Sequence, residues 1–96
     1  MFARATRIKG SSEQLEARML LTREELIPAA SKLDGFEGGI WLVDRQNSRF
    51  LSVTFWQSEE QLRASEEPIG RLRELAMNTV GGTVESVERY EVLAQI

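Results

Sequence analysis

The chain has 96 residues, of which 42% are hydrophobic and 28% charged, and its formal net charge is −3. This length allows one domain, residues 1–96, which buries only about 60–65% of its unfolded surface, so association is a natural supplement. The acidic balance disfavours a nucleic-acid partner, which needs a basic face. The sequence has no cysteine or histidine, which excludes disulfides, thiolate or histidine metal sites and Ser-His catalysis, and we expect no metal site.

No targeting or membrane segment is predicted. The Met1–Arg4 start lacks the apolar stretch of a signal peptide, and no apolar run reaches about 18 residues. We therefore expect a cytoplasmic protein without a membrane partner.

The first predicted element is a short strand over residues 2–9, which Gly10 ends. Ser11 and Ser12 follow as candidate N-caps, so a helix is expected to begin there.

A long bent helix follows, because apolar residues recur at helical spacing from Leu15 to Leu33. Pro28 removes one helix hydrogen bond and predicts a kink. Thr22–Glu25 fits a capping box, which makes a restart near Thr22 plausible. Asp34-Gly35 is the predicted stop.

Two strands joined by a hairpin come next. Residues 40–43 are apolar on both faces, which is typical of a strand covered on both sides. Residues 44–49 are polar and supply the hairpin, and residues 50–56 form the third strand.

Alternate residues of the third strand point to opposite faces of the sheet. We expect the core face to carry Leu51, Val53 and Phe55. The other face is mixed, with small polar groups framed by aromatic rings: Phe50, Ser52, Thr54 and Trp56.

The last elements are a helix and a strand. Ser58 is the predicted N-cap of the second helix, Pro68 is expected to break it, and Gly81-Gly82 ends it. Residues 83–94 form the last strand, with a bulge near its middle. The order β-α-β-β-α-β predicts an α+β ferredoxin-like fold, a four-stranded antiparallel sheet with the helices on one face.

The apolar pattern also predicts a homodimer. Two helices cover one face of such a sheet, yet residues 40–43 are apolar on both faces. The exposed patch of a monomer would be covered by a second copy packed sheet to sheet. The alternative is that Trp41 or Trp56 merely closes a sheet edge.

Three features resemble a known family. They are the Gly35-Phe36 turn, the Phe55-Trp56 pair, and the helix start Ser58–Ser65. Together they resemble the antibiotic-biosynthesis-monooxygenase-like (ABM) domains of the dimeric α/β-barrel superfamily, and residues 87–92 resemble an uncharacterised bacterial branch. The resemblance implies a homodimer with a cleft between sheet and helices in each protomer.

The resemblance also implies which reactions can be expected. Members include cofactor-free oxygenases of aromatic compounds and haem-degrading enzymes, and many have no known activity. The haem-degrading branch uses a strand-one Asn, a helix-two Trp and a His, none of which this chain supplies, so haem degradation is not expected. A cofactor-free monooxygenase would bind an apolar aromatic, stabilise its anion and exclude water, with no cofactor.

The candidate ligand-binding residues are Trp56, Phe50, Ser52, Thr54 and Tyr90, in a cleft near Trp56. Each has a structural alternative. Trp56 either lines a pocket or plugs the sheet with its N–H on a backbone carbonyl, and Tyr90 is more often a half-buried strand residue than an acid. Two functions remain open: binding or oxygenation of an apolar aromatic molecule, and a non-catalytic structural or regulatory dimer with a self-filled pocket.

Overall fold

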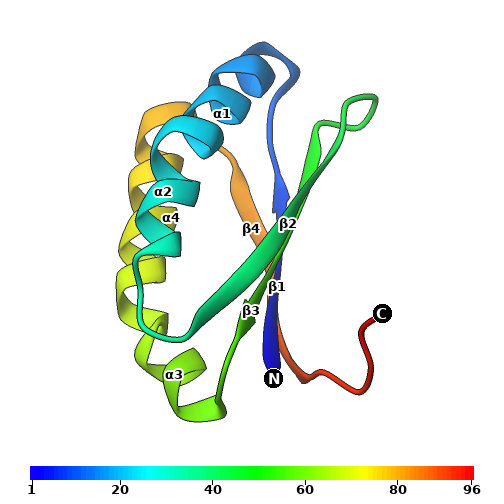
Figure 1. The fold of residues 1–96 in the computed structure, drawn as a ribbon. Coiled ribbons are helices and arrows are strands. Elements are labelled where there is room, and N and C mark those ends of the chain that lie inside the picture. Colours follow the sequence, from blue (N-terminus) through cyan, green and yellow to red (C-terminus); the bar gives the residue numbers. More distant parts are fainter.

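A four-stranded antiparallel sheet with helices on one face is the frame of the molecule (Figure 1). The computed structural model describes residues 1–96. The sheet order is β2-β3-β1-β4, formed by β1 (Phe2–Lys9), β2 (Phe36–Asp44), β3 (Arg49–Trp56) and β4 (Thr83–Glu91). The second face of the sheet carries no helix (Figure 1). This confirms the predicted α+β ferredoxin-like fold.

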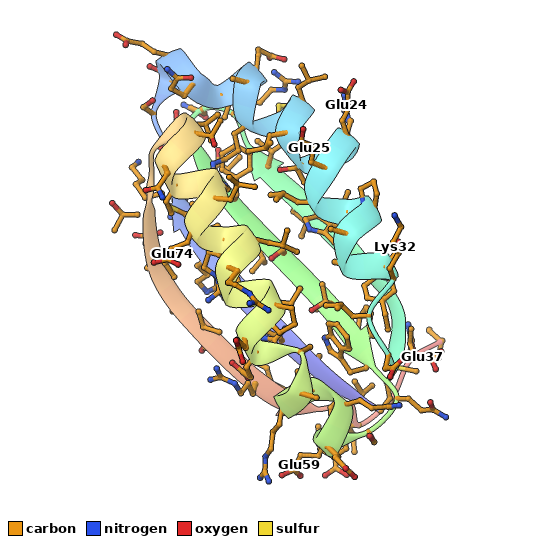
Figure 2. The ribbon with its side chains drawn as sticks, turned by 90° about the vertical axis from the view of Figure 1, so that its left-hand side faces the viewer. Glu24, Glu25, Lys32, Glu37, Glu59 and Glu74 are labelled. Atoms are coloured by element: carbon orange, nitrogen blue, oxygen red, sulfur yellow. The ribbon has the colours of Figure 1, made fainter.

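Two helical arms cross the sheet side by side (Figures 1 and 2). The first arm consists of a 3₁₀ turn η1 (Ser12–Gln14), α1 (Leu15–Leu21), a π-helical turn η2 (Thr22–Leu26) and α2 (Ile27–Ser31). The second arm consists of α3 (Glu59–Ala64) and α4 (Glu66–Val80). No helix has the length and apolarity needed to span a membrane.

The first arm continues through Thr22 without the restart that the capping box predicted. The Thr22 hydroxyl donates to the carbonyl of Arg18 at 2.8 Å, one turn back, so it caps nothing. The N–H of Ile27 bonds to the carbonyl of Thr22, five residues earlier, which makes this turn π-helical. The wider turn lies directly before Pro28, whose ring would crowd the carbonyl of a regular α-turn.

The second arm breaks at Ser65 and not at Pro68. The Ser58 cap is confirmed, because its hydroxyl accepts from the N–H of Gln61 at 3.1 Å. Ser65 donates its hydroxyl to the carbonyl of Leu62 at 2.6 Å and separates α3 from α4. Pro68 then sits in the first turn of α4, where a backbone N–H has no intrahelical partner and its loss costs nothing.

The two faces of β3 are the reverse of the prediction. The helix-facing side carries Phe50, Ser52, Thr54 and Trp56, and Thr54 and Trp56 are buried there. Leu51, Val53 and Phe55, predicted as the core, lie on the uncovered side. With its neighbours on β2 this surface, the open face, is apolar: Ile40, Leu42, Leu51, Val53 and Phe55. Hydrophobicity predicted the wrong side of β3 as the core face, because both sides of the strand carry large apolar side chains.

β4 is bulged near its start and not near its middle as predicted, and it is shorter than predicted. The register with β1 shifts between Arg7 and Ile8, which leaves Glu85 as the extra residue. The strand ends at Glu91, and Tyr90, for which a half-buried position was the structural alternative, is exposed.

Candidate functional site

An open cleft lies between the helical arms and the sheet. Its larger cavity has a volume of about 310 Å³ and is lined mainly by apolar side chains from α1, η2, β2 and β3. The lining residues are Ile8, Arg18, Met19, Thr22, Arg23, Leu26, Ile27, Trp41, Leu42, Val43, Phe50, Leu51 and Ser52. This volume lies at the lower end of the range found for small-molecule sites.

A smaller cavity of about 80 Å³ adjoins the larger one, because Ile8, Arg18, Leu26, Trp41 and Ser52 line both. It extends toward α4, and its remaining lining residues are Arg4, Thr6, Ala30, Thr54, Ile69, Leu72, Arg73 and Ala76. We call the two cavities together the cleft.

Trp41 is the aromatic residue shared by both cavities, and Gly39 makes room for its ring. A Cβ atom at Gly39 would come within 2.6 Å of the Trp41 ring. The two residues are neighbours on the helix-facing side of β2, so the missing side chain of Gly39 is the space into which the indole folds. Sequence reasoning weighed Trp41 only as a sheet-edge residue.

The structure brings three of the predicted ligand-binding residues to the cleft. Phe50 and Ser52 line the larger cavity, and Ser52 and Thr54 line the smaller one. Trp56 lines neither cavity, and Tyr90 lies on the open face, where its hydroxyl donates to Glu88 at 2.8 Å. The cleft is therefore beside Trp41, and not beside Trp56 as predicted.

Trp56 packs as a structural residue. Its side chain is fully buried, and its ring meets that of Phe36 edge to face with the centroids 5.6 Å apart. The indole N–H donates to the hydroxyl of Thr54 at 3.0 Å, whereas a backbone carbonyl was the predicted acceptor. The guanidinium of Arg4 lies 5.6 Å from the ring centroid. Trp56 thus lies outside the cleft and holds Thr54, a residue of the cleft lining, through this hydrogen bond.

Two buried arginines border the cleft. Arg4 donates from Nη2 to the carbonyl of Leu62 at 3.0 Å and to the hydroxyl of Ser65 at 2.8 Å. Arg18 donates to the carbonyl of Gly81 at 2.8 Å, and its guanidinium lies 5.4 Å from the centroid of the Phe50 ring. Burial lowers the pKa of both arginines, and Glu66 partly offsets this effect for Arg4.

Sequence reasoning missed Arg18, although a signal was present. Four cleft residues of the first arm recur every four positions, beside Met19, Arg23 and Ile27: Arg18, Thr22, Leu26 and Ala30. A search restricted to the 3.6-residue α-helical period followed only the apolar members and left Arg18 out.

Glu66 joins β1, β4 and α4 through its carboxylate. It lies 3.3 Å from Nη2 of Arg4 and accepts two hydrogen bonds from Arg89. The hydrogen bond from Arg89, aided by Arg4 and opposed by partial burial, lowers the pKa of Glu66 to about 2.

This shift predicts a loss of stability in acid. Because the pKa is lower in the folded state than its ordinary value of 4.5, the stabilisation is complete above pH 4.5 and is lost as pH falls toward 2. The side chain is 34% exposed, so screening reduces the contribution, and we expect Glu66→Gln to remove about 1 kcal/mol of it. Urea unfolding at pH 6 and pH 3 measures the effect. Glu67→Gln, next along the chain and exposed, is the control; an equal pH dependence in both variants would contradict the assignment.

Comparison with known sequences places relatives in Mycobacterium tuberculosis. No family model matches the chain. The uncharacterised protein Rv2557 is 33% identical over 94 residues, which cover 98% of this chain and 42% of the relative. The uncharacterised protein Rv2558 is 29% identical over 92 residues, covering 96% of this chain and 39% of the relative. The chain thus spans about two fifths of the length of these relatives.

Several solved structures share the fold along nearly the whole chain. A Deinococcus radiodurans protein, provisionally named an antibiotic biosynthesis monooxygenase, aligns with a TM-score of 0.77 at 18% identity and covers 100% of this chain and 96% of its own. A variant of SnoaB, described as a cofactor-independent oxygenase from Streptomyces nogalater, aligns with a TM-score of 0.72 at 11% identity, covering 99% and 95%. Rv0793 of Mycobacterium tuberculosis aligns with a TM-score of 0.73 at 14% identity, covering 98% and 96%.

Proposed function

We propose that this chain, which has the fold of the antibiotic biosynthesis monooxygenases, is a homodimer that binds an apolar aromatic small molecule in the cleft beside Trp41. The observation that carries the proposal is the larger cavity, about 310 Å³ of open space lined mainly by apolar side chains. A soluble domain gains no stability from leaving such a volume unfilled, so a ligand is the simplest reason for it.

The side chains of the cleft favour a planar ligand. Trp41 and Phe50 supply aromatic surface, and the hydroxyls of Ser52 and Thr54 supply polar contacts on the same side of the sheet. Trp56 contributes by holding the Thr54 hydroxyl in place. Tyr90 lies on the opposite side of the sheet and makes no contact within this cleft.

Cofactor-free oxygenation is the reaction that we propose for a bound substrate. An aromatic compound with an activated CH₂ group loses a proton, passes electrons to O₂ and becomes a carbonyl compound. One oxygen atom enters the product and the other leaves as water, so four electrons are transferred in total. The protein would bind the substrate, exclude water and stabilise the anion, which requires no histidine.

A thermal-shift and tryptophan-fluorescence screen with quinols, anthrones and flavonoids tests the binding. We expect at least one class to raise the melting temperature and change the Trp41 emission. Oxygen uptake with that compound then separates an oxygenase from a binding protein. If no compound changes either signal, the proposed function is wrong.

The open face supports the homodimer. Ile40 and Leu42 are each 49% exposed, and they lie beside Leu51, Val53 and Phe55 in one apolar surface. Soluble monomers rarely leave such a surface exposed, and a second copy packed sheet to sheet would bury it.

Charge on the open face is expected to dissociate the dimer. Native protein should have twice the chain mass by light scattering after gel filtration, and Ile40→Glu should be a folded monomer because the carboxylate would be buried unpaired in the interface. Leu75→Glu is the matched control, since Leu75 is 48% exposed on the helical side. A native monomer at low micromolar concentration would disprove the dimer.

The alternative, a non-catalytic dimer whose own side chains fill its pocket, is less favoured. The open volume beside Trp41 counts against it, because a self-filled pocket would leave no space of this size.

A further inference from the structure

The smaller cavity holds positive charge without a matching carboxylate. Arg18 and Arg73 both line it, one from α1 and one from α4. Neither takes part in any ion pair of the structure. Arg18 is only 4% exposed, so solvent does little to balance its charge. With Arg4, which is paired with Glu66, three arginines thus border one small space.

The acidic residues of the helical arms point elsewhere. Glu24 and Glu25 on η2 and Glu74 on α4 are exposed to solvent, and Figure 2 labels all three on the two helical arms. Glu66 is already bound to Arg4 and Arg89, although its charge also acts on Arg73. No carboxylate of the chain forms an ion pair with Arg18.

The burial of these arginines without a counter-ion is energetically unfavourable. A guanidinium stays protonated at every physiological pH, and a buried charge without a counter-ion carries a large desolvation penalty. Burial lowers the pKa of both Arg18 and Arg73, and Glu66 partly offsets this effect for Arg73. Carboxylates and phosphates are the anions that the planar fork of an arginine fits, and either would supply the missing negative charge.

The two cavities differ in size and in polarity, and together they would fit a ligand with one polar and one aromatic end. The smaller one, about 80 Å³, has room for a carboxylate but not for a fused ring, and it holds the hydroxyl groups of Thr6 and Ser52. The larger one holds the Trp41 and Phe50 rings. Arg18 reaches both cavities and marks the junction between them.

We propose that the ligand is an aromatic carboxylate, with its carboxylate group between Arg18 and Arg73 and its ring system in the larger cavity against Trp41. This inference rests on the proposed function, since it names the class of molecule that the cleft accepts.

The test compares 2-naphthoate with the neutral isostere 2-naphthamide. The native protein should bind naphthoate at least about tenfold more tightly, since a charge-assisted hydrogen bond contributes that much or more. Calorimetry gives the affinities, and the indole N–H signals in a ¹⁵N NMR spectrum give the location. The Trp41 signal should shift, and that of the buried Trp56 should move less.

Arginine variants separate charge recognition from general effects. Arg73→Gln should weaken naphthoate binding about tenfold and leave naphthamide unchanged. Arg71→Gln on the same helix removes an exposed arginine and should change neither. Arg18→Lys keeps the charge but loses the planar fork, so it should also weaken naphthoate selectively, and its melting temperature shows whether the fold is intact.

Two results would overturn the inference in distinguishable ways. Equal affinity for naphthoate and naphthamide, with the Trp41 signal shifting for both, would disprove the carboxylate site and leave the aromatic cleft standing. Binding of neither compound, nor of any in the aromatic screen, would disprove both proposals.

Discussion

Replacement of Trp56 by alanine should destabilise the domain by about 3–5 kcal/mol, the range for a large aromatic residue lost from a core. The side chain is fully buried, so the change would remove the contact with Phe36 and leave Thr54 without its donor. It would also expose the charge of Arg4 to a cavity where the ring now lies. Since domains of this size are stable by about 5–15 kcal/mol, much of the variant would be unfolded at moderate temperature.

Urea unfolding followed by circular dichroism measures this loss. Trp41→Ala is the matched control, because it removes the same side chain from a half-buried position bordering open space, and about 1 kcal/mol is expected. If both variants lost equal stability, the structural role assigned to Trp56 would be wrong.

The second large effect concerns ligand binding. Trp41→Ala should weaken the binding of an aromatic ligand by about 10- to 100-fold, since an aromatic face in contact with the ligand contributes about 1–3 kcal/mol. Isothermal titration with a compound from the screen measures the change. Trp41→Phe keeps a ring in the cleft and should recover most of the affinity.

Loss of Trp56 should therefore have the larger effect on stability, and loss of Trp41 the larger effect on ligand binding. An undiminished affinity in Trp41→Ala would mean that the ligand sits outside the cleft. The proposed aromatic contact would then be wrong even if the protein binds the compound.

Local sequence chemistry was sufficient to predict the order of the elements. The Ser58 cap depends on neighbours in the chain and is confirmed, whereas the bulge in β4 lies nearer the start of the strand than predicted. The second arm ends at Val80, directly before Gly81, whose positive φ of 71° glycine adopts readily. The first arm ends at Ser31, before the predicted stop at Asp34-Gly35.

The face of β3 that turns toward the helices could not be predicted in the same way. A period of two separates the faces but does not say which one the helices cover, and here both hold large apolar residues. The helix-facing side is the more polar one because it borders the cleft, where Ser52 and Thr54 lie beside open space. Hydrophobicity therefore predicted the wrong side of β3 as the core face. The site was predicted beside Trp56, whereas the cleft lies beside Trp41.

The arginines of the cleft escaped prediction for a different reason. Charged residues on a helix are usually solvated, so nothing but the four-residue spacing that includes Arg18 set Arg18 and Arg73 apart from Arg71. Only the packing of the two arms against the sheet shows that the first two border a cavity while Arg71 is exposed.

The π-helical turn at Thr22–Leu26 has a consequence for the direction in which Arg18 points. Residues four apart in a regular α-helix drift apart by about 40° per step, because each residue turns the helix by about 100°. Over the three steps from Arg18 to Ala30 the drift would reach about 120°, and these two residues would face different surroundings. The extra residue of the π turn cancels this rotation, so the first arm keeps a single lining side. A chain one residue shorter here would keep its sheet and both arms, yet Arg18 would turn away from the cleft.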